Sequence, residues 1–240
     1  MENIDTSFSW VFGYGSLLWK PGFQHGDIEI GYIEGFSRRF WQGNETHRGR
    51  PGRPGRVATL VEDQGERTYG IAMEMGGDLA LDYLNNRESK LGGYSQEVTN
   101  FYVLNSSKPP IPVLVYVANN LSPSWLGPAD PDEIAEQVMA SEGAAGHNVE
   151  YVIRLAMWVH QVLPTITDKH LFDIEDMILV KIRERGKKLS DYMEVNKSYI
   201  NGAEFRELNS LGVTVNIARG PLEEYTCSYR KQKCIDCNIL

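Results

Sequence analysis

An apolar, aromatic run near the N-terminus has two glycines at its centre. Residues 10–19 read WVFGYGSLLW, and Lys20, Pro21 and Gly22 follow them. β-Branched and aromatic residues that end at Pro and Gly are typical of a strand. A glycine inside a strand costs packing and backbone entropy, so it marks a bulge or a close approach to the backbone. Successive exposed N–H groups there can hold a carboxylate or an oxyanion, so the run predicts a strand that ends in an anion-binding loop.

The composition excludes several classes of protein. With 240 residues the chain is long enough for one well-packed domain. Its net charge of −8 repels nucleic-acid phosphates, so we expect no nucleic-acid partner. The sequence has no run of about 18 apolar residues, and residues 1–5 lack the basic and apolar parts of a signal peptide. We therefore expect a cytoplasmic protein, and the patterns leave its oligomeric state open.

Hydrophobic periodicity divides the chain into a strand-rich first part and a helical second part. Short runs of β-branched and aromatic residues predict strands at 28–33, 36–42, 57–61, 68–75, 98–104 and 112–118. The polar segment 62–66 predicts a hairpin turn between the third and fourth of these strands. Helix signals follow at 132–141, 148–163 and 171–188. We expect one α+β domain over residues 1–189, a small barrel followed by helices, and an extension over residues 190–240.

Between these two parts, a helix predicted over residues 78–91 carries a glutamate on its apolar face. Leu81, Leu84, Glu88 and Leu91 share this face at helical spacing, and Gly92 and Gly93 end the helix. Burial raises the pKa of a carboxylate toward the range useful for proton transfer, which makes Glu88 a candidate general acid or base. From its position alone, the alternative is a structural ion pair between Glu88 and an arginine.

Four blocks of the sequence, in order, resemble one enzyme family. The loop at 11–17 is similar to the signature loop of the γ-glutamylcyclotransferases, and residues 10–19 are similar to their ChaC branch, which acts on glutathione. The further blocks are residues 37–43, His47 to Gly49 with 54–61, and Arg87-Glu88 with Gly92-Gly93-Tyr94. The resemblance covers residues 9–189. The chain departs from the branch where Ser89-Lys90-Leu91 separates Glu88 from the glycine pair, which bears on the position of Tyr94.

This resemblance implies a mixed β-barrel of the γ-glutamylcyclotransferase type, a catalytic helix and glutathione as the small-molecule substrate. Glu88 would take a proton from the substrate's α-ammonium, the amine would attack the γ-carbonyl, and Glu88 would return the proton to the departing nitrogen. The products would be 5-oxoproline and Cys-Gly. The scheme requires no metal and no organic cofactor, although it leaves room for stimulation by a divalent cation.

The same resemblance suggests which residues bind the substrate. Backbone N–H groups of the glycine-containing loop would hold a carboxylate or the oxyanion. The predicted substrate-binding residues are Val11, Phe12, Gly13, Tyr14, Gly15, Ser16, Leu17, Arg39, Gln42, Tyr94 and Tyr116. For Arg39 the alternative is a surface ion pair, and for Tyr116 a place in the core. Asp82 and Glu74 are the second choices for the acid/base.

Other functions are weaker alternatives. Ser16 is not in a Gly-x-Ser-x-Gly elbow, which disfavours a serine hydrolase. The segment Arg48-Gly49-Arg50-Pro51 resembles a minor-groove hook, but its place in an acidic chain favours a structural or substrate-lining loop. His47 beside it is a catalytic option, and the more common alternative for such a histidine is a hydrogen-bonded loop residue. Two rivals stay open: a non-catalytic binding module on the same fold, and a cyclotransferase for other γ-glutamyl dipeptides or amines.

The C-terminal extension holds every cysteine of the chain: Cys227, Cys234 and Cys237. The core therefore has neither a disulfide nor a cysteine nucleophile. Cys234 and Cys237 form a Cys-x-x-Cys, which supplies only two of the four ligands of a zinc site. The last four residues, from Cys237 to Leu240, have the form of a prenylation box, so a membrane partner is expected only if Cys237 is prenylated.

Overall fold

The computed structural model of the chain describes residues 9–90, 94–118 and 120–193, and a closed five-stranded barrel forms their centre. The strands are β1 (Trp10–Gly13), β2 (His25–Asn44), β3 (Gly55–Met75), β4 (Tyr94–Val103) and β5 (Ile111–Ala118). They are ordered β1-β3-β2-β4-β5, and parallel pairing of Val11 with Leu114 closes the barrel. The other neighbours run antiparallel, so the barrel is mixed, as predicted.

The two longest strands correct the predicted strand boundaries. Segments 28–33 and 36–42 belong to one strand, β2, because the chain passes through an irregularity between Glu34 and Phe36 where Gly35 has φ +81°. Segments 57–61 and 68–75 likewise belong to β3. The hairpin turn predicted at 62–66 is wrong, since both of its flanks pair with β2 instead of with each other. The glycines that suggested turns mark a bulge inside a long ribbon.

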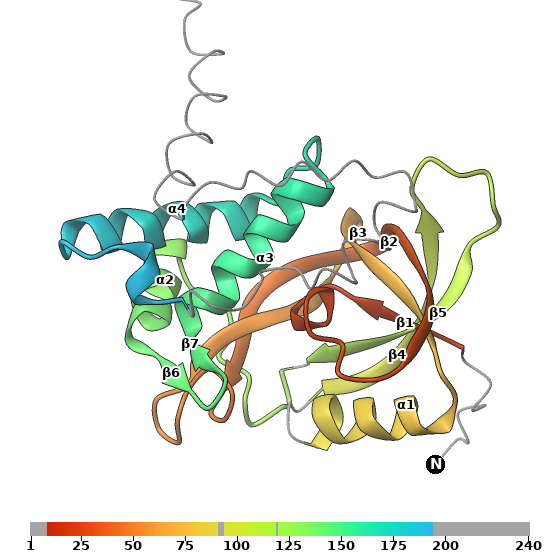
Figure 1. The fold of residues 1–240 in the computed structure, drawn as a ribbon, viewed down its shortest axis with the longest axis horizontal. Coiled ribbons are helices and arrows are strands. Elements are labelled where there is room, and N and C mark those ends of the chain that lie inside the picture. Colours follow the sequence, from red (N-terminus) through yellow and green to blue (C-terminus); the bar gives the residue numbers. More distant parts are fainter. Residues whose placement is uncertain (1–8, 91–93, 119, 194–240) are drawn as a thin grey trace, which may run out of the picture.

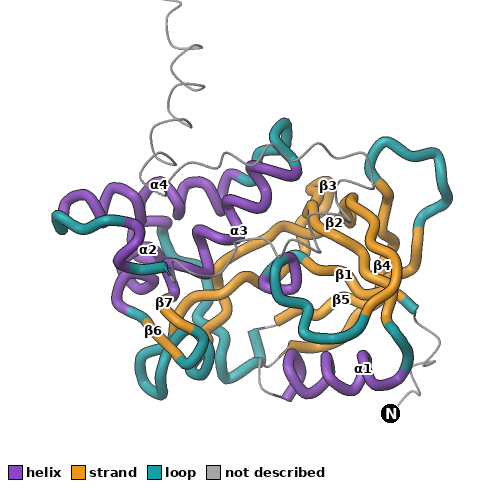
Figure 2. The backbone as a smooth tube through the Cα atoms, in the orientation of Figure 1, coloured by secondary structure: helices purple, strands orange, loops and turns teal. Residues whose placement is uncertain are grey.

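Three helices cover one side of this ribbon. They are α2 (Pro131–Ala140), α3 (Asn148–Val162) and α4 (Lys169–Glu184), and the predicted helices 132–141, 148–163 and 171–188 are confirmed within a few residues. Figures 1 and 2 show β2 and β3 running from the barrel to this helical layer, with the small hairpin of β6 (Glu142–Gly143) and β7 (Gly146–His147) beside α3. None of the helices in the part of the chain described here is long and apolar enough to cross a membrane.

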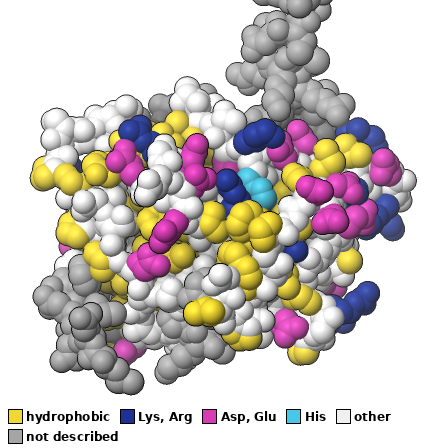
Figure 3. All heavy atoms as spheres, turned by 180° about the vertical axis from the view of Figure 1, so that it is seen from behind, with side chains coloured by type: hydrophobic (Ala, Val, Ile, Leu, Met, Phe, Trp, Pro, Cys, Tyr) yellow, Lys and Arg dark blue, Asp and Glu magenta, His cyan; other side chains and the backbone are white. Residues whose placement is uncertain are grey.

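The core is continuous from the barrel into the helical layer. Phe12, Phe101 and Met73 fill the barrel at 1% exposure or less, and Ile153 and Leu171 are fully buried between the helices. On the face opposite to that of Figure 1, acidic, basic and hydrophobic side chains are mixed (Figure 3). This one continuous core makes the described residues a single α+β unit.

The predicted helix 78–91 has two parts. α1 (Asp78–Leu84) is an α-helix, and the wider π-helical turn η2 (Asn85–Lys90) follows it and contains Glu88. Such π turns occur often at functional sites. The predicted glycine C-cap at residues 92–93 lies outside the described residues, as do the Cys-x-x-Cys and the prenylation box.

Candidate active site

A cavity of about 350 Å³ opens at one end of the barrel. The loop after β1 forms one wall, and the end of α1 with η2 forms the opposite wall. Asn44, His47 and Arg48 contribute from the segment that joins β2 to β3, and Tyr151 contributes from α3. The predicted anion-binding loop and the predicted acid/base therefore face each other across one space.

The loop after β1 turns sharply, and its glycines allow this. β1 ends at Gly13, and a short 3-10 helix, η1 (Ser16–Leu18), begins two residues after Tyr14. A Cβ atom on Gly15 would lie 2.9 Å from the hydroxyl oxygen of Tyr151, closer than real Cβ contacts, so a larger residue here would push the loop and Tyr151 apart. The first backbone hydrogen bond of the turn is donated by Leu18 N to Gly15 O at 3.0 Å. The first N–H groups of a helical turn lack partners within the turn, so those before Leu18 are candidates for binding an anion.

Glu88 lies on the π turn with its side chain 18% exposed. Burial raises the pKa of Glu88 above its usual value, and the Arg87 guanidinium offsets this only in part, although Arg87 Nε lies 2.9 Å from Glu88 Oε1. The ion-pair alternative from the sequence is thus present together with a raised pKa. A carboxyl with this balance exchanges protons more readily near neutral pH than an exposed one.

Arg87 joins the π turn to the loop opposite. Its Nη2 donates to Ser16 Oγ at 2.6 Å, and its Nη1 donates to the carbonyl oxygens of Lys20 and Pro21 at 2.8 and 2.9 Å. Since the same guanidinium pairs with Glu88, it sets the distance between the carboxylate and the loop.

Four tyrosines surround Glu88. They are Tyr14, Tyr94, Tyr116 and Tyr151, and all four line the cavity. Burial, with a smaller contribution from Glu88, raises the pKa of each hydroxyl, to about 12 for Tyr116 and Tyr151. All four therefore carry their protons at neutral pH and can act only as hydrogen-bond donors or neutral acceptors.

The cavity is rich in positive charge around its single buried carboxylate. Arg87 and Arg48 line it together with Lys20, which has no ion pair with any described carboxylate. The pKa of His47 is lowered by burial and then by Arg87, Lys20 and Arg48, so this imidazole is neutral at pH 7. No group of three or more His, Cys, Asp or Glu side chains suited to a metal ion occurs in residues 9–90, 94–118 and 120–193.

Eight of the predicted site residues come together here. Phe12, Tyr14, Gly15, Ser16, Leu17, Glu88, Tyr94 and Tyr116 line the cavity. Val11 and Gly13 lie behind it in β1, where Val11 is fully buried. Tyr94 reaches the cavity although residues 89–91 lengthen the spacing from Glu88, and its hydroxyl donates to Ala58 O at 2.9 Å.

The remaining predicted residues lie elsewhere. Arg39 lines a separate cavity and lies 3.4 Å from Asp63, which is the surface ion pair given as its alternative. Gln42 is fully buried and pairs through its backbone with Trp125. Asp82 is exposed outside the cavity, and the carboxylate of Glu74 accepts a hydrogen bond from Asp27 N at 3.4 Å.

The sequence analysis did not assign several residues of the cavity wall. These are Lys20, Asn44, Tyr83, Asn86, Ala145 and Tyr151, while Trp19, Arg48, Val57, Ala58 and Arg87 were named only within blocks. Lys20 follows the glycine-containing loop directly, and that position was its only signal. Tyr151 had no signal, because no spacing relates a residue on α3 to the loop after β1.

Comparisons with known proteins show the family of the chain. The family model for ChaC-like protein matches residues 9–181. Glutathione-specific gamma-glutamylcyclotransferase 1 of Danio rerio is 45% identical over 177 residues, which cover 72% of this chain and 90% of that protein. The protein of the same name from Homo sapiens is 44% identical over 177 residues, covering 72% and 80% of the two chains.

A solved structure shares the fold as well. The crystal structure of a selenomethionine-labelled γ-glutamyl cyclotransferase specific to glutathione from yeast aligns with a TM-score of 0.64 at 27% identity, over 71% of this chain and 95% of the yeast chain. The predicted barrel type is therefore confirmed. With a family model that spans most of its length, the chain belongs to the ChaC-like protein family.

Proposed function

We propose that this chain is a glutathione-specific γ-glutamylcyclotransferase that converts reduced glutathione into 5-oxoproline and Cys-Gly. The observation that carries the proposal is Glu88, a carboxylate whose pKa is raised by burial and which faces a glycine-containing loop across the cavity. The names of the relatives from Danio rerio and Homo sapiens support the same substrate and reaction.

In this reaction Glu88 acts first as a general base and then as a general acid. Ionised Glu88 first accepts a proton from the α-ammonium of the substrate, and the free amine then attacks the γ-carbonyl carbon to close a five-membered ring. The carbonyl becomes a tetrahedral oxyanion, which collapses as the bond to the cysteinyl nitrogen breaks. Glu88 returns its proton to that nitrogen. It then carries the second proton, which the ring nitrogen loses on becoming a neutral lactam N–H, to the departing amine, so the enzyme ends in its starting state. No water, metal or organic cofactor enters the balance.

The cavity supports this substrate by its charge. Glutathione carries two carboxylates and one ammonium, and the cavity presents Lys20, Arg48 and Arg87 around Glu88. We assign the ammonium to Glu88 and one carboxylate to the ammonium of Lys20, which no carboxylate of the described residues pairs with. Much of the rate acceleration comes from holding the amine against the γ-carbonyl, because orientation alone contributes about 7–11 kcal/mol in well-aligned intramolecular reactions.

The proposal also places the protein in the cytoplasm. All three cysteines lie in residues 227–240, so the domain around the site depends on no disulfide and suits a reducing compartment.

The test is release of 5-oxoproline from reduced glutathione, oxidised glutathione and γ-glutamyl-alanine by the wild type and by Glu88→Gln. Turnover of reduced glutathione that collapses in a folded Glu88→Gln protein is the expected result. Turnover of γ-glutamyl-alanine alone would keep the mechanism and change the substrate. Absence of turnover with all three would favour a binding module on this fold.

A further inference from the structure

The hydroxyl groups of the four tyrosines around Glu88 differ in how they use their protons. Tyr14 donates to Tyr116 O at 2.5 Å, Tyr94 donates to Ala58 O at 2.9 Å, and Tyr116 donates to Asn85 Oδ1 at 2.8 Å. These three protons are bound to acceptors of the protein. Their hydroxyls therefore build the wall of the cavity and are not free to donate a hydrogen bond to a substrate.

Tyr151 has the opposite arrangement. Its hydroxyl oxygen accepts a hydrogen bond from Ala58 N at 3.1 Å, and within the described residues no hydrogen bond has Tyr151 as its donor. Tyr151 is 5% exposed and lines the cavity, so a buried O–H group is left without an acceptor among the residues that the structure describes. A buried donor of this kind costs free energy unless a ligand satisfies it.

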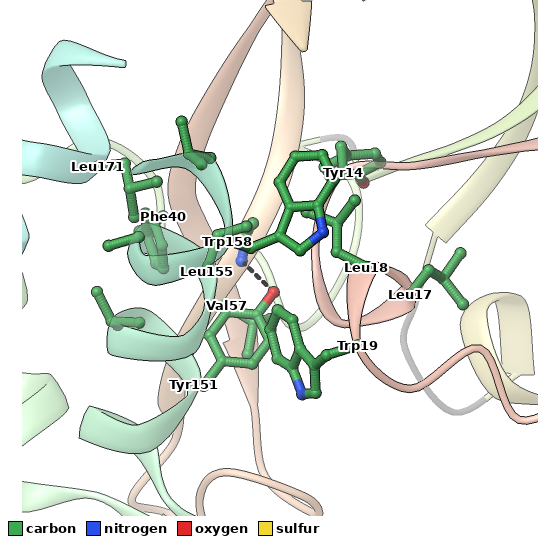
Figure 4. Packing of buried hydrophobic residues seen from close by; sticks show 14 of the residues in the cluster. Tyr14, Leu17, Leu18, Trp19, Phe40, Val57, Tyr151, Leu155, Trp158 and Leu171 are labelled. Carbon is green, nitrogen blue, oxygen red and sulfur yellow. Dashed lines mark hydrogen bonds between the residues drawn. The ribbon is translucent and has the colours of Figure 1, made fainter. Parts of the chain in front are cut away.

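The position of this hydroxyl is fixed from three sides. The ring of Tyr151 packs edge-on against Trp19, with 5.4 Å between ring centroids, and against Phe40 at 6.2 Å. Figure 4 shows the ring beside Trp19, with its hydroxyl oxygen at the end of the hydrogen bond from the barrel backbone. These contacts hold the O–H in place before any substrate binds, which is the condition for electrostatic preorganisation.

The hydroxyl also lies against the glycine-containing loop. The 2.9 Å approach to the Cβ position of Gly15 brings the phenol O–H beside the backbone N–H groups that follow Tyr14. Two kinds of donor, main-chain N–H and phenol O–H, thus meet at one end of the cavity, and Glu88 lies on the wall opposite this loop.

We propose that Tyr151 is a catalytic residue whose hydroxyl donates a hydrogen bond to the oxyanion that forms on the γ-carbonyl. The inference rests on the proposed function and deepens it by assigning a side chain to the oxyanion. When the α-amine attacks, the C=O bond becomes C–O⁻, and the hydrogen bond from Tyr151 strengthens as that charge grows. The proton stays on Tyr151, whose pKa is raised to about 12, and only Glu88 transfers a proton.

The first test is the Tyr151→Phe variant in the 5-oxoproline assay with reduced glutathione. Loss of one preorganised oxyanion donor lowers kcat by about 10²–10³-fold, with KM changed little, because the donor acts on the transition state. Tyr102→Phe is the matched control, since Tyr102 lies on the barrel wall, stacked on Tyr32, and lines neither cavity. An unchanged kcat, or a raised KM at unchanged kcat, overturns the assignment while the proposed function stands.

A second variant separates the strength of Tyr151 as a hydrogen-bond donor from its role in holding the fold. Tyr151→Phe also removes the acceptor of Ala58 N–H, and a loss of activity through misfolding would lower the melting temperature as well. Replacement of Tyr151 by 3,5-difluorotyrosine keeps the hydroxyl and its bond to Ala58 but makes it more acidic and a stronger donor. We expect a change in kcat without a change in KM at a pH where the group stays protonated. Kinetics identical to wild type would refute a role in catalysis. An inactive wild type would instead overturn the proposed function, and the inference with it.

Discussion

Glu88 and Glu150 are both removed from water by the same fold, but their surroundings act on them in opposite directions. Burial raises the pKa of Glu88, and one guanidinium offsets it only partly. Burial also acts to raise the pKa of Glu150, but hydrogen bonds from Arg48 and Arg154 bring it below its usual value. Glu150 is bound by Arg48 at 2.8 Å and by Arg154 at 2.7 Å. The Glu88 carboxylate therefore binds a proton more readily than usual, whereas the Glu150 carboxylate is kept ionised by its two arginine partners.

This contrast separates chemistry from architecture inside one core. A buried group with incomplete partners costs stability and gains reactivity, whereas a fully paired one fixes the position of its neighbours. Glu150 pairs with Arg48, which lines the cavity, and with Arg154. These ion pairs fix the position of Arg48 in the wall of the cavity that contains Glu88.

The largest effect should follow from removing the carboxylate of Glu88. Glu88→Gln keeps the shape but cannot accept a proton, so we expect kcat to fall by about 10²–10⁴-fold. Its melting temperature should stay at or above that of the wild type at pH 7, because ionised Glu88 is buried at a cost. The measurements are 5-oxoproline release and thermal unfolding. A variant that loses stability along with activity would mean that Glu88 is a structural residue like Glu150.

Removing Glu150 should have the reverse signature. Glu150→Gln removes the buried carboxylate that Arg48 and Arg154 both bond to, so we expect a loss of about 3 kcal/mol of unfolding free energy. For a domain of this size that lowers the melting temperature by about 6–12 °C. Below the transition, kcat should fall less than in Glu88→Gln.

Glu142→Gln is the matched control for this change, because Glu142 is 57% exposed and lies 3.6 Å from Arg50. Exposed pairs contribute at most about 1 kcal/mol. Equal melting temperatures for the two variants would show that the Glu150 cluster does not stabilise the fold.

The sequence predicted the residues around Glu88 better than it predicted the ion-pair cluster around Glu150. Gly13, Gly15 and Glu88 have local signals, since glycines interrupt a strand and a glutamate interrupts an apolar helix face. The cluster of Arg48, Glu150 and Arg154 depends on folding α3 against the segment after β2, which no local spacing encodes.

Arg39 illustrates another limit. Neighbours in a strand point to opposite faces, and Arg38, at 3% exposure, is the one directed inward, where it bonds to Tyr14 O at 2.9 Å. The sequence reveals the alternation but not which face meets the cavity. The predicted break of β3 at 62–66 failed for a related reason, because a polar bulge and a turn have the same composition.

Close contact between the loop and Tyr151 gives a smaller, sharper test. Gly15→Ala places a methyl group 2.9 Å from the Tyr151 hydroxyl oxygen, so the two must move apart and we expect about tenfold lower kcat. Adding Tyr151→Phe removes the atom that clashes, so the double variant should lose less than the product of the single losses. Gly52→Ala is the control, because Gly52 has φ +74° and open space around it, which strains the backbone without touching the cavity. Independent, multiplicative effects would exclude the contact.

The pH dependence should also separate the two glutamates. Glu88 must be ionised to accept a proton, so kcat/KM should rise with pH along a limb whose pKa lies above 4.5. Glu150 has a lowered folded pKa, so its contribution to stability is complete above about pH 4.5 and is lost as pH falls through the folded value. Activity measured against pH should therefore decline before the melting temperature does. A common midpoint for both curves would mean that the loss of activity reports unfolding.

The smallest expected effect concerns Lys20, the cation at the cavity that no described carboxylate neutralises. Lys20→Gln removes one attraction for a substrate carboxylate in a partly exposed setting, so we expect KM for glutathione to rise about 3–10-fold with kcat nearly unchanged. The KM of the wild type for glutathione should rise as salt is raised, because screening weakens the attraction of an exposed charge. The KM of the variant should depend little on salt. Lys108→Gln is the control, because Lys108 pairs with Glu29 away from the cavity. If Lys20→Gln lowers kcat and leaves KM unchanged, Lys20 acts on the transition state. The view that Glu88 carries the chemistry while Lys20 only binds substrate would then be wrong.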